Sequence, residues 1–456
     1  MTHAVAEYPS PELQGREGPP AALESLAPLH GRAVPLETRT NRGLAFGVGL
    51  LLAVLTVQTE YVGTPTDFVS RVAPVDFLCV ALLALLFFRH SLKLPPRPAF
   101  LYLAAILVSL IPGLLFTSGP ERDVWVGASA LLMALGYYVL GINLGASRTL
   151  IHWLLAGLCV GVFGQAIIVV HDVVSPTQWF PDPMEGRVRG TFKANGQLGA
   201  YGFCAAGLLV TFGSTLGSPA FRKACVALAI TAASFVFLAS RRTGMISVFA
   251  WGALFCVLAH RFSKRVFFKI FVGGYLAVML AVGAFWPQIE ASFIGRRFMD
   301  AVSSMGKDEG FIQNQFKSCL ETAGQWFPLG FGVGRGSHIN LRDGHEIHNC
   351  ILAVLVELGV LGLLGYLGTV LLPLLKRQWR QRSADHELLG VILTSFLLIS
   401  LVFMCHNTLD RDRTFLLYLG IATMVVAQES RLWMPSQYFP SAGQGNLESC
   451  RIPAGE

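Results

Sequence analysis

Charged residues are scarce in this sequence. They make up 14% of its 456 residues, against 53% hydrophobic residues, whereas an ordinary soluble domain carries about 25% charged residues. The mean hydropathy is accordingly +0.55. So few charges cannot cover the water-facing surface of a chain this long, which excludes an ordinary soluble protein.

Several motifs that mark common functions are also missing. None of the nine cysteines stands in a Cys-x-x-Cys pair, so neither a disulfide framework nor a zinc site is indicated. The glycine-rich stretch 328–336 is not followed by Lys-Ser/Thr, which excludes a P-loop. His345 and His348 lie three residues apart, and a zinc metalloprotease helix needs a spacing of four. The sequence therefore predicts neither a metal site nor a cofactor.

Long apolar runs are present instead. Most of them approach the about 20 residues that a helix needs to cross a bilayer, and the shorter ones lengthen with their Gly, Thr and Ser flanks. We expect an all-α, polytopic membrane protein with about twelve transmembrane helices. The expected spans are 44–57, 75–88, 99–116, 124–142, 150–170, 198–212, 224–239, 245–259, 266–286, 350–375, 388–404 and 415–426.

The basic residues indicate how these spans are oriented. Residues 1–42 are rich in Pro, Gly and charge without the order of a cleaved signal, and we interpret them as a disordered cytoplasmic tail. With this tail inside, the connections on the cytoplasmic side carry clusters of Arg and Lys, as the positive-inside rule requires. The membrane domain then covers 43–430, and 431–456 is a second cytoplasmic tail. The net charge of +7 is thus topological and indicates lipid rather than nucleic acid as the partner.

Some arginines break this rule, because they fall on the outer side. An Arg at bilayer depth costs about 2.5 to 3.5 kcal/mol on insertion scales and usually faces a cavity or a partner. The doubled arginines between the seventh and eighth spans are the sharpest case, although anchors that snorkel to the interface explain them equally well. The outer basic groups are Arg187, Arg189 and Lys193; Arg241 and Arg242; Arg296, Arg297, Arg335 and Arg342; and Arg411 with Arg413.

The longest connection, 287–347, is predicted as a large outer loop between the ninth and tenth spans. Its segment 311–320 is an amphipathic helix that either lies on the membrane surface or over a cavity, or packs as an ordinary loop helix. The glycines of 328–336 allow either exposed amides that hold an anion or a flexible turn. His348 follows at the outer end of the tenth span, where it acts either as a general base or as a structural hydrogen-bonding group. Glu357, deeper in that span, is either functional or a helix-packing residue.

The outer turn 406–413 holds Asp410 and Asp412 in the Asp-x-Asp spacing by which some membrane glycosyltransferases bind a divalent cation. Arg411 and Arg413 alternate with these acids and would repel a metal ion. We therefore favour ion pairs within the turn over a metal site.

Taken in order, these motifs resemble the O-antigen ligase and polysaccharide polymerase family of bacterial membrane glycosyltransferases. The resemblance covers about 189–367, whereas the first four spans match only in being hydrophobic. Ala194 stands where the family often has Pro, and of the doubled arginines Arg242 fits better, because it is followed by Thr and Gly. The segments that carry the resemblance are 189–195, 240–244, 328–336 and 348–363.

The resemblance implies a C-type glycosyltransferase-like fold in the bacterial inner membrane, with the active site facing the periplasm. It implies inverting, metal-independent transfer of a glycan from undecaprenyl pyrophosphate to a glycan, to lipid A core or to a protein. The residues implied as catalytic are Arg189 and Arg242, which bind the pyrophosphate, and His348, the base. The residues implied in substrate binding are Arg241, Asn195, Asn349, Arg335 and Glu357. The alternative is a non-catalytic transporter or flippase whose outer arginines bind the same anionic lipid.

Overall fold

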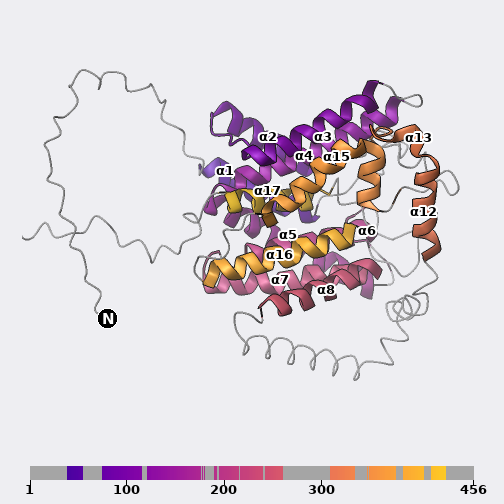
Figure 1. Ribbon diagram of the computed structural model, residues 1–456. Helices are drawn as coiled ribbons and strands as arrows, with labels where there is room; N and C mark the ends of the chain where they lie inside the picture. Colours follow the sequence, from indigo (N-terminus) through magenta and orange to yellow (C-terminus); the bar gives the residue numbers. More distant parts are fainter. Residues whose placement is uncertain are drawn as a thin grey trace, which may run out of the picture.

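The computed structural model consists of α-helices throughout the part that it describes (Figure 1). This part comprises residues 38–54, 74–115, 121–175, 177, 179, 189–192, 195–214, 216–239, 242–259, 309–333, 347, 349–375, 384–404 and 412–427. Its helices are α1 (Arg39–Val54), α2 (Pro74–Phe88), α3 (Arg97–Leu115), α4 (Glu121–Gly145), α5 (Arg148–Val174), α6 (Asn195–Thr211), α7 (Pro219–Leu238), α8 (Arg242–Ala259), α12 (Glu309–Glu321), α13 (Ala323–Trp326), α15 (Cys350–Leu375), α16 (Ala384–Met404) and α17 (Arg413–Ala427). The predicted all-α fold is confirmed for these residues.

Within the described ranges, five helical segments are long and apolar enough to cross a membrane. They are Arg97–Leu115, Gly127–Gly145, Arg148–Val174, Pro219–Leu238 and Cys350–Leu374. Shorter apolar helices accompany them at Pro74–Phe88, Gln197–Thr211, Gly244–Leu258, Leu389–Phe403 and Arg413–Ala427. These are the elements of a multi-pass helical membrane protein. The predicted total of twelve spans also depends on residues outside the described part, such as 266–286.

Glycines allow the helices to pair closely. Gly157 of α5 lies against the backbone of α1 at Phe46, and Gly141 of α4 lies against the backbone of α17 at Leu417. A contact of the same kind joins α6 to α7 at Gly202. In a membrane the surrounding lipid is as apolar as the side chains, so helices associate through such close approach of their backbones.

The packed helices run in the directions that alternate membrane crossings require. The contacts of α4 with α17 advance along both helices, from Tyr138 against Gly420 to Gly145 against Met424, so these helices are parallel. The contacts of α1 with α5 advance in the same way, whereas α3 and the later part of α15 are antiparallel. The predicted order of spans gives these same three relations.

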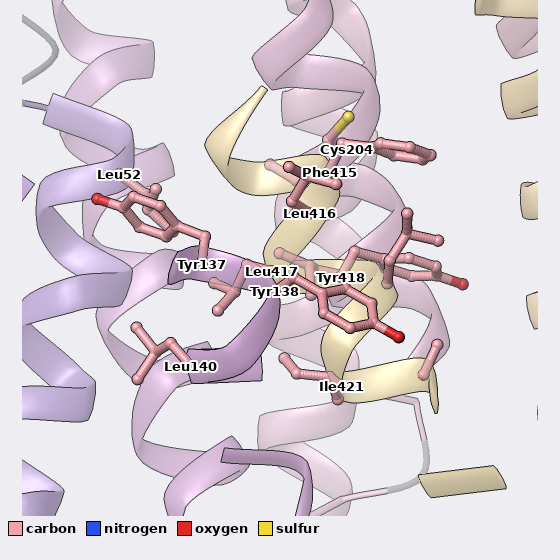
Figure 2. Close-up of a cluster of buried hydrophobic side chains, with 14 of the residues drawn as sticks. Leu52, Tyr137, Tyr138, Leu140, Cys204, Phe415, Leu416, Leu417, Tyr418 and Ile421 are labelled. Atoms are coloured by element: carbon pink, nitrogen blue, oxygen red, sulfur yellow. The ribbon is translucent and has the colours of Figure 1, made fainter. Parts of the chain in front are cut away.

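Aromatic side chains from α4 and α17 fill the centre of the bundle (Figure 2). Tyr137 and Tyr138, neighbours on α4, turn their rings to opposite sides in Figure 2. The Tyr138 hydroxyl donates to the hydroxyl oxygen of Thr423 on α17 at 3.1 Å, and the Tyr137 hydroxyl donates to Asp76 of α2 at 2.8 Å. The hydroxyl groups of these two buried tyrosines therefore both have an acceptor, as an apolar interior requires.

One expected span, 350–375, is not a straight helix. Gly359 has φ 71° and ψ −169°, which interrupts α15, and Figure 1 shows this helix as two ribbon pieces that meet at a sharp angle. The Cys350 thiol lies 3.7 Å from the Tyr366 hydroxyl, 16 residues further on, although a straight helix would separate their backbones by about 24 Å. The first half of α15, residues 350–358, therefore folds back beside the second half, residues 360–375.

Candidate functional site

The structure describes some of the predicted site residues and not others. Those described with their side chains are Arg189, Asn349 and Glu357. Those described only as the first residues of helices are Asn195 in α6 and Arg242 in α8. Those outside the described residues are Arg241, Arg335 and His348.

Arg189 begins a tight turn that rests on α5. The Phe192 N–H donates to the Arg189 carbonyl at 3.1 Å, and Gly190 has a φ of 55°, which favours glycine. The Thr191 hydroxyl and the side-chain amide of Gln165 are joined by a hydrogen bond of 3.0 Å, and both side chains are buried. A Cβ atom at Gly190 would overlap the same amide. The turn therefore fits against α5 without room for a side chain at Gly190.

Gln165 supports the Arg189 turn, and sequence reasoning missed it. It is fully buried in α5, a helix of otherwise mostly apolar composition. The side-chain amide of Gln165 satisfies both its oxygen and its nitrogen when the two are interchanged. In that orientation its N–H group also donates to the Ala53 carbonyl of α1 at 3.2 Å. A buried amide left without such bonds costs about 1 to 3 kcal/mol, so these contacts hold the Arg189 turn firmly in place. A lone amide within the apolar run 150–170 was the signal that could have found it.

Asn195 and Arg242 begin two helices that run in the same direction. Short connections join α6 to α7 and α7 to α8, so α6 and α8 both run antiparallel to α7. The helices α6 and α8 also contact each other. Their N-termini therefore lie at the same end of the bundle. A helix N-terminus carries a partial positive charge and N–H groups without helical partners. An anion relieves the repulsion between this partial charge and an arginine placed there.

Asn349 caps the first half of α15. Its side-chain oxygen accepts a hydrogen bond from the Leu352 N–H at 2.9 Å, and its carbonyl accepts one from the Ala353 N–H at 2.8 Å. The Cys350 thiol at this N-terminus lies 3.7 Å from the hydroxyl of Tyr366, which is seven residues after the break. The sequence predicted this N-terminus at the outer end of a span. That placement stays a prediction, and the structure adds that α15 is interrupted at Gly359.

Glu357 lies in the angle between the two halves of α15. It is 8% exposed and lines a cavity of about 10 Å³, a volume with room for about one water molecule. Tyr366 and Thr369 of the second half line the same cavity, together with apolar residues of α3, α4 and α17. An ionisable side chain so placed in the apolar interior of a helical membrane protein is a candidate for function.

Arg413 is bound by a residue that the sequence did not suggest. Its guanidinium donates to both carboxylate oxygens of Asp76 in α2, each at 2.7 Å, and Asp76 is 1% exposed. Arg413 therefore forms an ion pair with a residue outside its own turn, while Asp410 and Arg411 of that turn lie outside the described residues. Asp412 instead caps α17, where it accepts a hydrogen bond from the Phe415 N–H at 2.8 Å. A bidentate buried pair gives Arg413 a structural role.

The amphipathic helix predicted for 311–320 is confirmed as α12. Cys319 faces inward, and its carbonyl accepts a hydrogen bond from the Trp326 indole N–H of α13 at 3.1 Å. Phe316 and Leu320 are exposed, so the helix is packed on one side only. Burial raises the pKa of the Cys319 thiol to about 11, which keeps it protonated at neutral pH and unsuited to act as a nucleophile.

The chain was also compared with known proteins. No family model and no curated protein matches it. A function must therefore be argued from the motifs and contacts described above.

Proposed function

We propose that this protein is a glycosyltransferase of the bacterial inner membrane, with about twelve transmembrane helices. It moves a glycan from undecaprenyl pyrophosphate to an acceptor hydroxyl on the periplasmic side, as an O-antigen ligase or a surface polysaccharide polymerase. The acceptor is a second glycan, lipid A core or a protein. The observation that carries the proposal is the Arg189 turn, which a buried amide of α5 holds at the start of α6.

The proposed role of Arg189 and Arg242 is to bind the pyrophosphate. A guanidinium stays charged at any physiological pH and donates to two phosphate oxygens at once. When the bond between the anomeric carbon and the phosphate oxygen breaks, its electrons leave with the pyrophosphate, and the added negative charge strengthens these contacts. The N-termini of α6 and α8 lie at one end of the bundle and add partial positive charge there. This arrangement supports an anion site.

His348 is the proposed base. It takes the proton of the acceptor hydroxyl as the hydroxyl oxygen bonds to the anomeric carbon from the side opposite the pyrophosphate, so the anomeric configuration is inverted. Asn349, the next residue, caps the first half of α15 and is held by that helix. The remaining proposed substrate-binding residues are Arg241, Asn195, Arg335 and Glu357.

A transporter or flippase for lipid-linked glycan is the second candidate. It is favoured by the combination of an interrupted helix at Gly359 and a buried carboxylate, Glu357, beside it, because interrupted helices form the substrate sites of many transporters. Such a protein would bind the anionic lipid through its arginines and would need no base.

The experiment compares surface glycan from cells that carry the wild type, His348→Ala or Arg189→Ala at equal expression. Arg222→Ala is the matched control, because Arg222 is an exposed arginine at the start of α7. A transferase loses attached or extended glycan in both test variants, and the lipid-linked donor accumulates. Full glycan in His348→Ala with loss in Arg189→Ala would favour the transporter, and full glycan in both would refute either function.

The same cells separate ligase from polymerase. If wild-type activity is that of a polymerase, the defective variants make short glycan chains. If it is that of a ligase, they accumulate full-length polymer that is not attached to an acceptor. Both results support the proposed transfer, because each is a failure of transfer at a different acceptor.

A further inference from the structure

Backbone hydrogen bonds tie the break in α15 to a segment of the outer loop, residues 328–332. The N–H groups of Phe331 and Gly332 donate to two carbonyls of the first half of α15, at 2.8 and 3.0 Å. In return, the Val360 N–H of the second half donates to the Pro328 carbonyl at 2.9 Å. In an unbroken helix the same groups would bond within α15. Segment 328–332 therefore replaces the hydrogen bonds that the break removes.

Glycines make this crossing of two backbones possible. Gly330 and Gly359 have φ angles of 93° and 71°, which L side chains rarely adopt. A Cβ atom on Gly359 would overlap the Pro328 carbonyl oxygen, and one on Gly330 would lie 2.6 Å from the Gly359 nitrogen. Alanine at either position therefore separates the segment from the helix.

Packing on both sides holds the segment itself in place. Trp326, just before it, lies in a small buried cluster with Leu352 and Val356 of the first half of α15. At its other end, Gly332 lies directly against Gly113 of α3. The first half of α15 is thus connected through the segment both to the outer helix α13 and to the membrane helix α3.

We propose that segment 328–332 is a brace that fixes the first half of α15 in its folded-back position, and that Gly330 and Gly359 are positioning residues for transfer. The inference rests on the proposed function, since the first half begins directly after the proposed base. The brace supplies hydrogen bonds on both sides of the break, so the break is a fixed bend and not a loose hinge. In an enzyme, a shift of about 1 Å in a reacting group costs about 100-fold in rate.

The test uses the full-length protein in lipid nanodiscs, with undecaprenyl pyrophosphate as the binding probe and lipid-linked glycan from the host cells as the donor for turnover. The variants are Gly359→Ala, which changes the helix, and Gly330→Ala, which changes the segment and leaves the sequence of α15 intact. Gly324→Ala is the matched control, because a Cβ atom at this nearby position of α13 meets open space. We expect turnover to fall by about 100-fold in both variants, with binding of undecaprenyl pyrophosphate and turnover of the control unchanged.

The outcomes separate the brace from the proposed function. Turnover in Gly330→Ala equal to that of the control overturns the brace, even if Arg189→Ala is inactive in the same assay. Activity that falls only in proportion to the amount of folded protein, with turnover per folded molecule unchanged, overturns the positioning role as well. If instead the proposed function is wrong, the wild type itself neither binds undecaprenyl pyrophosphate nor transfers glycan.

Discussion

The two halves of α15 have a similar apolar composition but are held in different ways. The second half packs along α3 through Gly362, Gly365 and Gly368, which lie against side chains or backbone of that helix. The first half packs against Trp326 and, unlike the second half, also receives hydrogen bonds from segment 328–332 and a cap from Asn349. Packing through glycines holds a helix that crosses the bundle, whereas directed polar bonds hold a helix that folds back inside it. The halves should therefore respond to different substitutions.

The largest effect is expected at the buried ion pair of Asp76 and Arg413. This pair tests how much a buried polar interaction contributes to the stability of the bundle. Asp76→Ala leaves a guanidinium that is largely buried without its carboxylate, which costs about 3 to 5 kcal/mol of stability. Thermal unfolding in detergent measures the loss. The double variant Asp76→Leu with Arg413→Met should recover part of it, because no unpaired charge remains, although the Tyr137 hydroxyl still loses its acceptor. Equal losses in the single and double variants would contradict a role as a charge pair.

A smaller effect is expected from crowding the second half of α15. A Cβ atom at Gly365 would lie 2.7 Å from the Tyr102 carbonyl oxygen of α3, so Gly365→Leu should cost about 1 to 3 kcal/mol through overpacking. The measurement is again thermal unfolding, with Gly252→Leu of α8 as the control, because Gly252 faces open space. If both leucine variants unfold at the wild-type temperature, packing through glycine does not hold this half.

Removing the cap of the first half should have a still smaller effect. Asn349→Ala removes the acceptor of the Leu352 N–H, and the loss of an N-cap costs about 1 kcal/mol. Asn349→Asp keeps an acceptor and should retain stability near that of the wild type. Unfolding curves of the two variants give the difference, and identical curves would show that the cap does not matter.

The smallest effect concerns the reactivity of Cys319 beside the first half. Because burial raises the pKa of its thiol to about 11, the reactive thiolate is rare at pH 7 and increases as the pH rises toward that value. Maleimide labelling followed by mass spectrometry should show slow modification at pH 7 and faster modification at pH 9. A cysteine introduced at the open position 324 is the control, and equal labelling of both at pH 7 would contradict the buried position of Cys319.

Much of the helical framework could be predicted from the sequence, but not the break. Apolar runs predicted helices at 150–170, 224–239 and 245–259, and the structure has α5, α7 and α8 at these places, because an apolar run is a local feature. The run 350–375 is apolar on all sides, so its composition gives no sign of a bend. What stabilises the bend is a set of hydrogen bonds from 328–332, a tertiary contact that no local pattern encodes.

The same limit applies to the candidate site. The sequence singled out Arg189 and Arg413 for the same reason, namely their predicted position on the outer side. The structure distinguishes them, because Arg413 is bound by Asp76, a residue 337 positions away, while a turn on Gln165 carries Arg189. Partners so distant in sequence can be found only from the folded chain.

The folded-back geometry of α15 is tested most directly by the distance between spin labels at Ile351 and Leu371, with a pair at Leu361 and Leu371 as the reference within the second half. All three positions retain some exposure. A straight helix would separate Ile351 from Leu371 by about 30 Å and the reference pair by about 15 Å. The contact of Cys350 with Tyr366 predicts that the Ile351 pair is no farther apart than the reference pair. A separation about twice that of the reference pair would show a continuous helix and would contradict the account.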